Sequence, residues 1–175
     1  MTPQLRDLIQ RALAQDSRAQ KELYDQFAAK VHRLTLRMVA ASEADDVTQQ
    51  TFMKMFQGLA KFQGDASFST WLYRIAINEC LQHRRRQRAP AEQLPVELVD
   101  SSAATAERLE QTDLMQQALI NLDEKLRAVV LLREVEGLSY EQIAEVLEIP
   151  AGTVASQLNR ARAELRLYLT NVMTG

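Results

Sequence analysis

The sequence predicts an all-α protein made of two small helical domains joined by a flexible linker, and three observations support this. Apolar residues recur at spacings of three and four over long stretches, which is the period of an amphipathic helix. The 175 residues include only five glycines and four prolines, and runs of alternating β-branched residues are missing. With 46% apolar and 25% charged residues, the composition is that of a globular protein, not of a disordered or collagen-like one.

Charge is distributed unevenly along the chain and predicts where the domains end. The formal net charge is −2, but residues 1–90 carry 14 basic and 9 acidic side chains, a net charge of +5. Residues 91–112 have a net charge of −4, and residues 113–175 have a net charge of −3. The middle segment has few large apolar residues, so burial cannot offset the entropy lost on ordering it. We expect one domain over 1–89, an acidic linker over 90–112 and a second domain over 113–175.

At the start of the first predicted domain, over residues 1–89, two helices are predicted. Ser17 and Gln20 have capping-box spacing, and apolar residues at helical spacing follow them, so we expect a helix from about 17 to 40. A second helix begins near 42–44, with acidic residues close to its positive end. Its polar face carries Asp45, Asp46, Gln49, Gln50 and Met53. Taken alone, this face is best interpreted as an ordinary solvated surface.

A third helix is predicted after a loop at 61–67 that contains Gly64 and Asp65. This helix opens near Ser67 and ends in a cluster of arginines. Phe68 and Leu72 can face the core. The helix cannot also turn all of its other large side chains in this stretch toward the core, namely Trp71, Tyr73, Ile77 and Asn78. Some aromatic and amide surface should therefore be exposed. Aromatic rings stack on unpaired bases while arginine neutralises phosphate, a combination that holds single-stranded nucleic acid. The segment is explained equally well if Trp71 and Tyr73 are partly buried packing residues and the arginines only keep the helix end soluble.

In the second predicted domain, over residues 113–175, the pattern predicts a helix-turn-helix. Apolar residues recur at helical spacing from Leu114 to Val135, and Gly137 supplies a helix end. Ser139 and Gln142 form a capping box that opens a short helix, and a longer helix follows Pro150. The outward face of that last helix carries residues suited to base edges and phosphates: Thr153, Ser156, Gln157, Arg160 and Arg162. An ordinary helical hairpin is the alternative.

Several classes of function are disfavoured by what the sequence lacks. No apolar run is long enough to span a membrane, and the amino terminus is polar, so we expect a cytoplasmic protein without a signal peptide. Cys80, the only cysteine, agrees with a reducing compartment. Cys80 and His83 share a helical face, but no further ligand lies nearby, so no zinc site is expected. With two histidines and no glycine-rich phosphate loop, we predict no enzyme, catalytic residue, metal or cofactor.

Three motifs together resemble the extracytoplasmic-function sigma factors, bacterial initiation factors for RNA polymerase. The resemblance covers about residues 17–88 and 113–168. The motifs are EADDVTQQTF at 43–52, FSTWLYRIAIN at 68–78, and GLSYEQIAEVL at 137–147 with the IPAGTV that follows at 149–154. In order and at these separations the three motifs are strongly specific, although each alone is only moderately so.

The resemblance implies a fold and a role for each set of residues. It implies a region-two bundle that binds core polymerase, and a region-four helix-turn-helix that reads the upstream promoter element. Contacts with the coiled coil of the polymerase largest subunit would come from Asp45, Asp46, Gln49, Gln50 and Met53. Contacts with the downstream element, where a base is flipped from the non-template strand, would come from Lys61, Gly64, Asp65, Ser67, Trp71, Tyr73, Arg74, Asn78, Arg84, Arg85 and Arg86. The upstream element would be read by Thr153, Ser156, Gln157, Arg160 and Arg162.

The chain departs from the family pattern at four positions. The family's last helix commonly carries basic residues where this chain has Ala155 and Gln157, and an aromatic residue or histidine at the place of Asn159. Fewer phosphate contacts imply weaker binding and a salt-dependence slope reduced by roughly one per lost contact. Gln50 replaces an acid that the family usually has, which removes one charge pair but keeps a hydrogen-bonding group.

The sequence therefore predicts a sigma factor whose partners are core RNA polymerase, through the largest-subunit coiled coil and the flap, promoter DNA and an anti-sigma factor. The alternative is a regulator that uses the helix-turn-helix alone, independently of polymerase. Such a regulator does not need the first predicted domain, and the presence of that domain argues against it. Residues 113–149 hold 3 basic and 8 acidic side chains. Free protein should accordingly bind duplex DNA poorly and depend on core polymerase for the remaining affinity.

Overall fold

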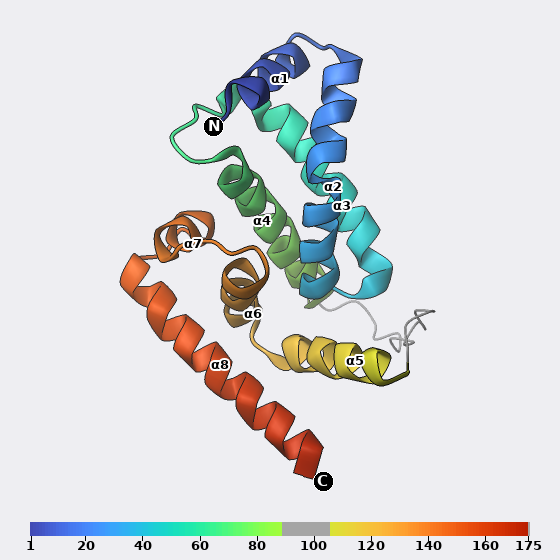
Figure 1. Ribbon diagram of the computed structural model, residues 1–175, viewed down its shortest axis with the longest axis vertical. Helices are drawn as coiled ribbons and strands as arrows, with labels where there is room; N and C mark the ends of the chain where they lie inside the picture. The colour runs from blue at the N-terminus through green and yellow to red at the C-terminus, as the bar shows by residue number, and fades with distance from the viewer. Residues whose placement is uncertain (89–105, 175) are drawn as a thin grey trace.

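In the computed structural model, which describes residues 1–88 and 106–174, every described secondary-structure element is a helix and none is a strand. The helices are α1 (Pro3–Leu13), α2 (Ser17–Met38), α3 (Ala41–Gly58), the short 3₁₀ turn η1 (Leu59–Lys61), α4 (Phe68–Arg88), α5 (Ala106–Asn121), α6 (Glu124–Val130), the π-helical segment η2 (Leu131–Val135), α7 (Tyr140–Leu147) and α8 (Ala151–Thr174). The predicted fold class, two all-α domains, is confirmed (Figure 1). Among the described helices, none has the length and apolar character needed to cross a bilayer.

The first domain is a bundle of α2, α3 and α4 with α1 across one end (Figure 1). Its core is formed by side chains that recur at helical spacing, such as Leu23, Phe27 and Val31 on α2. Helix α1 was not predicted, although Thr2 caps it by accepting a hydrogen bond from the Leu5 amide and Pro3 occupies its first turn.

Helix α2 begins at Ser17 as predicted, but its cap and the start of α3 differ from the prediction. Asp16, not Ser17, caps α2: its Oδ1 accepts from the Arg18 and Ala19 amides at 2.9 and 3.2 Å. Gln20 is therefore one position too late for a capping box, and its amide donates instead to the Ala12 carbonyl at 3.2 Å. Helix α3 already begins at Ala41 with no side-chain cap, which places Asp45 in the second turn, where the helix dipole contributes less.

The second domain contains the predicted helix-turn-helix, formed by α7 and α8. Both parts of the Ser139–Gln142 capping box are present. Glu148 adopts a left-handed conformation, with φ of 54°, in the tight turn between the two helices. Gly137, with φ of 69°, follows the end of η2 as the sequence predicted.

The helices before the helix-turn-helix are more interrupted than the apolar spacing predicted. The stretch from Leu114 to Val135 is divided into separate helices at Asp123, which caps α6 by accepting from the Lys125 amide at 3.0 Å. Helix α5 starts at Ala106, so the end of the predicted linker is helical; the rest of that linker up to residue 105 lies outside the described residues.

The two domains are packed against each other. Helix α7 lies against α4, and α5 and α6 lie against α2 (Figure 1). This arrangement was not predicted, because the sequence indicated two independent units on a tether. It determines which of the predicted functional residues are open to solvent.

Candidate nucleic-acid interface

The polar face of α3 is open to solvent along its whole length. All five predicted contact residues on this helix, Asp45, Asp46, Gln49, Gln50 and Met53, are exposed. Met53 is the apolar residue among these five and is 55% exposed. Two carboxylates, two amides and one flexible thioether therefore form a continuous helical surface that is suited to a basic protein partner.

An open groove of about 510 Å³ lies beside this face, between α2 and α3. From α2 it is lined by residues that the sequence analysis missed, chiefly Tyr24, Ala28 and His32. The imidazole Nε2 of His32 lies 3.0 Å from Asp45 Oδ1, and the Tyr24 ring packs on Phe52 with centroids 4.5 Å apart. Their spacing of four residues along a helix was the signal that could have revealed them.

The predicted downstream-element loop is exposed at its polar positions. Lys61, Gly64, Asp65 and Ser67 are all open to solvent. Gly64 has φ of 84°, a left-handed conformation that favours glycine in this turn. Ser67 Oγ accepts a hydrogen bond from the Thr70 amide at 3.0 Å and so fixes the start of α4.

Trp71 is half-buried in an aromatic cluster at the base of this loop. Its ring centroid lies 5.2 Å from that of Phe62 and 5.5 Å from that of Phe68. A Cβ added to Gly58 would lie 3.5 Å from the indole, so the indole also packs against the end of α3. Trp71 therefore has a packing role, and Asn78 is the exposed side chain among the residues that the sequence could not place together in the core.

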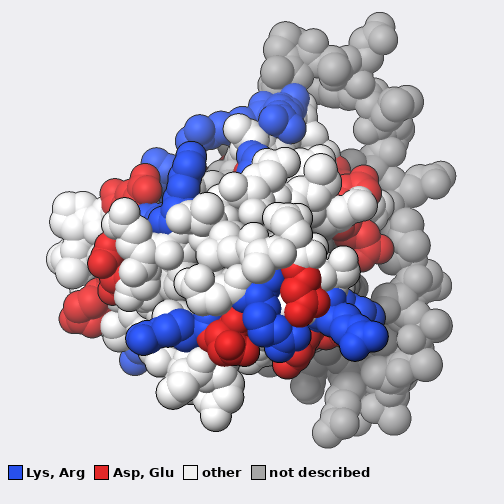
Figure 2. Space-filling model, turned by 90° about the horizontal axis from the view of Figure 1, so that it is seen from above, with Lys and Arg blue, Asp and Glu red and all other residues white. Residues whose placement is uncertain are grey.

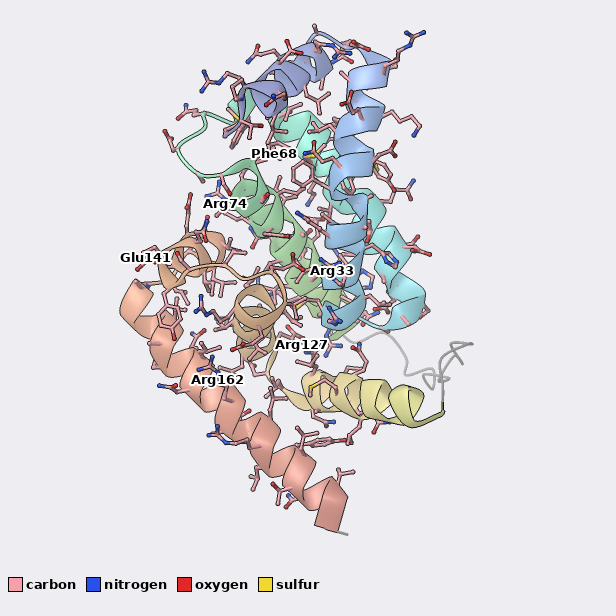
Figure 3. All side chains as sticks on the ribbon, viewed as in Figure 1. Arg33, Phe68, Arg74, Arg127, Glu141 and Arg162 are labelled. Carbon is pink, nitrogen blue, oxygen red and sulfur yellow. The ribbon has the colours of Figure 1, made fainter. Side chains whose placement is uncertain are left out.

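Tyr73 is buried between the two domains. It is 5% exposed, and its hydroxyl donates a hydrogen bond to Glu136 at the end of η2. Glu136 also forms an ion pair with Arg33 of α2, with Nη2 and Oε1 3.4 Å apart. The next residue, Arg74, points from α4 toward α7, where its Nη1 lies 3.9 Å from Glu148 Oε1 (Figure 3). Tyr73 therefore faces the second domain, whereas Arg74 remains partly exposed.

The arginines at the end of α4 are divided between the domain interface and the surface. Arg84 reaches across to Glu124 of α6, with Nε and Oε1 2.9 Å apart. Arg85 and Arg86 are exposed, and Arg86 donates to Gln82 within the same helix at 3.1 Å. Two arginines of the predicted set thus remain open for phosphate contacts.

Helix α8 presents its predicted polar face with several side chains already engaged. Arg160 pairs with Glu164 one turn later at 2.8 Å, and Arg162 Nε donates to Glu134 at 3.2 Å. Ser156 is exposed and donates to the Thr153 carbonyl at 2.9 Å, while Thr153 and Gln157 are half-buried. The pairing of Arg160 and Arg162 with glutamates agrees with weak binding of the free protein to duplex DNA. In the view of Figure 2, taken from the α1 end of the molecule, basic and acidic side chains likewise lie next to each other along one edge.

Cys80 and His83 lie in different environments. Cys80 is fully buried, and burial raises the pKa of its thiol to about 12. His83 Nε2 lies 3.2 Å from Glu43 Oε2. Within the described part of the chain, no three or more potential metal ligands come together.

Burial, together with the hydrogen bond to Glu136, raises the pKa of the Tyr73 hydroxyl. A tyrosine pKa is about 10 in unfolded chains. Because the folded-state pKa is higher, the stability that Tyr73 contributes is complete below pH 10 and is lost as the pH rises above it. In a spectrophotometric titration at 295 nm, we expect wild type to show a step well above pH 10 that Tyr73→Phe lacks. In guanidinium chloride this step should return to about pH 10; if the step that Tyr73→Phe removes from the native protein already lies at pH 10, the buried geometry is contradicted.

The fold and the exposed surfaces together define a two-domain transcription factor, with a helical bundle that presents an exposed helical face and a second domain that contains a helix-turn-helix. The family model for Sigma-70 region 2 matches residues 23–89, and the model for Sigma-70 region 4 matches residues 112–165. The chain belongs to the extracytoplasmic-function (ECF) sigma factors. It therefore binds core RNA polymerase, directs it to specific promoters and assists initiation of transcription.

Curated relatives match nearly the whole chain. The ECF RNA polymerase sigma-E factor of Escherichia coli strain K12 is 35% identical over 178 residues, covering 93% of each chain. The factor of the same name from Haemophilus influenzae is 36% identical and covers 93% of this chain and 94% of its own.

Solved structures show the same arrangement of helices. CnrH, solved in complex with the cytosolic domain of CnrY, matches with a TM-score of 0.73 and 27% identity over 95% of this chain and 97% of CnrH. The sigma factor RpoE of Bartonella quintana, solved with the anti-sigma factor NepR, shares the fold with a TM-score of 0.67 and 23% identity over 86% of this chain and 96% of RpoE.

Proposed function

We propose that this sigma factor divides recognition among three surfaces. The α3 face of Asp45, Asp46, Gln49, Gln50 and Met53 binds the coiled coil of the polymerase largest subunit, and the second domain binds the flap. The loop at 61–67 and α4 hold the downstream element, and the outward face of α8 reads the upstream element. The observation that carries this proposal is the exposed α3 face, whose carboxylates, amides and Met53 serve no role in the core.

The division of the chain follows the same proposal. Residues 1–89 form the polymerase-binding and downstream-element domain, residues 113–175 form the upstream-element domain, and residues 90–112 connect them. The factor works in the cytoplasm through binding alone, with no chemical step of its own. An anti-sigma factor controls it; in support, the solved CnrH chain is in complex with the cytosolic domain of another protein.

The test is reconstituted transcription. Purified protein is added to core RNA polymerase on fragmented genomic DNA of the native host, and the 5′ ends of the transcripts are sequenced. We expect transcripts from a small set of start sites that share an upstream and a downstream element. If core polymerase shown to be active with another sigma factor starts nowhere with this chain, the proposed function is wrong. If the chain alone protects a specific duplex, the polymerase-independent alternative is favoured.

A further inference from the structure

A small polar cluster joins α3 to the last turns of α4. Lys54 of α3 reaches across to two residues of α4: its Nζ pairs with Glu79 and lies 3.5 Å from Gln82 Oε1. The same Gln82 oxygen accepts a hydrogen bond from Arg86 Nη2 at 3.1 Å. Two cations from two helices therefore converge on one amide oxygen. Of these residues, only Arg86 was among the contacts expected from the sequence.

The charges of this cluster do not cancel. Glu79 is 6% exposed, so its carboxylate is largely removed from water and needs the pairing with Lys54. Lys54 and Arg86 are exposed, and so is Arg85 beside them. Three cations thus stand against one buried acid, which makes this corner of the first domain locally positive on a chain with a formal net charge of −2.

The geometry of the cluster suits a phosphate better than it suits an amide. An ammonium group has three N–H donors and a guanidinium group has five, so Lys54 and Arg86 keep donors beyond those directed at Gln82. Hydrogen bonds from such cations to an anionic oxygen are about twice as strong as those to a neutral acceptor. Among the described residues, none accepts from Gln82 Nε2, so this amide can donate to the same anion.

The cluster lies far along α4 from the loop at 61–67. Asn78, Gln82 and Arg86 are exposed at a spacing of four residues and so share one face of the helix. From Phe68 to Gln82 the helix rises about 21 Å at 1.5 Å per residue. This length corresponds to about six base pairs of duplex at 3.4 Å each. A phosphate at Gln82 would therefore belong to a different part of the promoter from a base held at the loop.

We infer that Lys54, Gln82 and Arg86 form a phosphate-binding site for the backbone of promoter DNA. The inference rests on the proposed role of α4 in holding the downstream element. It gives α3 a second role, because Lys54 follows Met53 of the proposed polymerase-binding face on the same helix. The site recognises charge and not base edges, so it adds affinity for any sequence and leaves promoter choice to other residues.

Gln82→Glu is the decisive variant. It keeps the size of the side chain and places a carboxylate between Lys54 and Arg86, where it forms ion pairs and takes the place of the phosphate. We expect the fold to be kept and holoenzyme to bind a promoter fork roughly tenfold more weakly, with a salt-dependence slope smaller by about one to two. A fork of scrambled sequence should lose the same factor. Fluorescence anisotropy over a salt series measures both quantities.

The matched control is Gln10→Glu, because Gln10 is exposed on α1 and undergoes the same change of charge. It should bind both forks like wild type. A second test variant, Lys54→Met/Glu79→Gln, removes the cation without leaving a buried carboxylate unpaired or changing the net charge. Its slope should fall by about one. Far-UV circular dichroism checks that each variant keeps its helices. Wild-type affinity and slope in a folded Gln82→Glu variant overturn the site.

A comparison of DNA substrates identifies the source of the phosphate. If Gln82→Glu weakens binding to the fork but not to the single-stranded non-template oligonucleotide, the phosphate belongs to the duplex. If it weakens binding to both, the phosphate belongs to the single strand. Either result supports the site, and unchanged binding to both substrates overturns it.

The free chain at low salt, where phosphate contacts are strongest, separates this site from the proposed function. Gln82→Glu should weaken binding of the free chain to the fork as well. If wild-type holoenzyme starts no transcription while Gln82→Glu still weakens binding by the free chain, the proposed function is wrong and the phosphate site stands. If wild-type holoenzyme transcribes and Gln82→Glu binds like wild type with and without polymerase, the site is wrong and the proposed function stands.

Discussion

Replacing both Asp46 and Gln49 with lysine is expected to reduce transcription with core polymerase at least a hundredfold without changing the fold. Both side chains project from the exposed face of α3, so the substitutions leave no cavity and break no core contact. Bringing like charges together at an interface costs several kcal/mol, and every 1.4 kcal/mol is about a tenfold change in affinity. The measurement is binding to core polymerase by fluorescence anisotropy, followed by run-off transcription.

The matched control for this charge reversal is Asp7→Lys. Asp7 is an exposed acid on α1, whose carboxylate is 71% exposed and makes only a 3.9 Å contact with Arg11. We expect this variant to bind core polymerase and support transcription like wild type. Unimpaired transcription by the Asp46 and Gln49 double variant would show that polymerase is bound by another surface, and the α3 assignment would have to be abandoned.

Replacing Arg127 with methionine is expected to destabilise the protein by about 3 kcal/mol. Arg127 is fully buried and donates to three carbonyls, those of Met38 at 2.8 Å, Leu122 at 3.2 Å and Ile120 (Figure 3). Hydrogen bonds from a charged donor contribute about 1.5–3 kcal/mol each, and acceptors left buried without a donor add a penalty. Methionine keeps much of the apolar volume, so the loss measures the polar contacts more than a cavity.

Urea unfolding followed by two signals is the appropriate measurement. Trp71, the only tryptophan, reports the first domain through its fluorescence, and far-UV circular dichroism reports all helices. In Arg127→Met we expect the circular dichroism transition to begin at lower urea than the fluorescence transition, because the second domain loses its anchor on α2. Arg166→Met, at an exposed position of α8, should behave like wild type. Unchanged midpoints in Arg127→Met would mean that the buried guanidinium contributes nothing net.

Local sequence patterns predicted those parts of the fold that depend on a few neighbouring residues. The Ser139 capping box, the glycine at 137 and the apolar face of α8 were all predicted correctly, because each is decided within one or two turns of helix. The capping residue of α2 was wrong for an equally local reason. Asp16 and Ser17 are both good caps, and Asp16 is held in place by an ion pair with Arg11 at 2.9 Å.

The relation between the domains could not be predicted, because it depends on pairs that are distant in sequence. Arg127 lies in a helix where a basic residue would ordinarily be expected at the surface, and one of the three carbonyls that accept from it in its buried position, that of Met38, is 89 residues away. Tyr73 was expected at an exposed DNA-reading surface and is instead covered through Glu136, 63 residues away. The exposed candidates, by contrast, could be predicted, because exposure on an amphipathic helix follows from its period.

The protected thiol in the core makes this protein easy to label at one chosen position. Cys80 is the only cysteine, is fully buried and has a pKa raised to about 12, so very little of it is thiolate at neutral pH. A cysteine introduced on the surface would react with a maleimide dye while Cys80 stays intact, and the native core would need no substitution. Dyes could thus be attached one at a time to report the shape of the molecule during the transcription cycle.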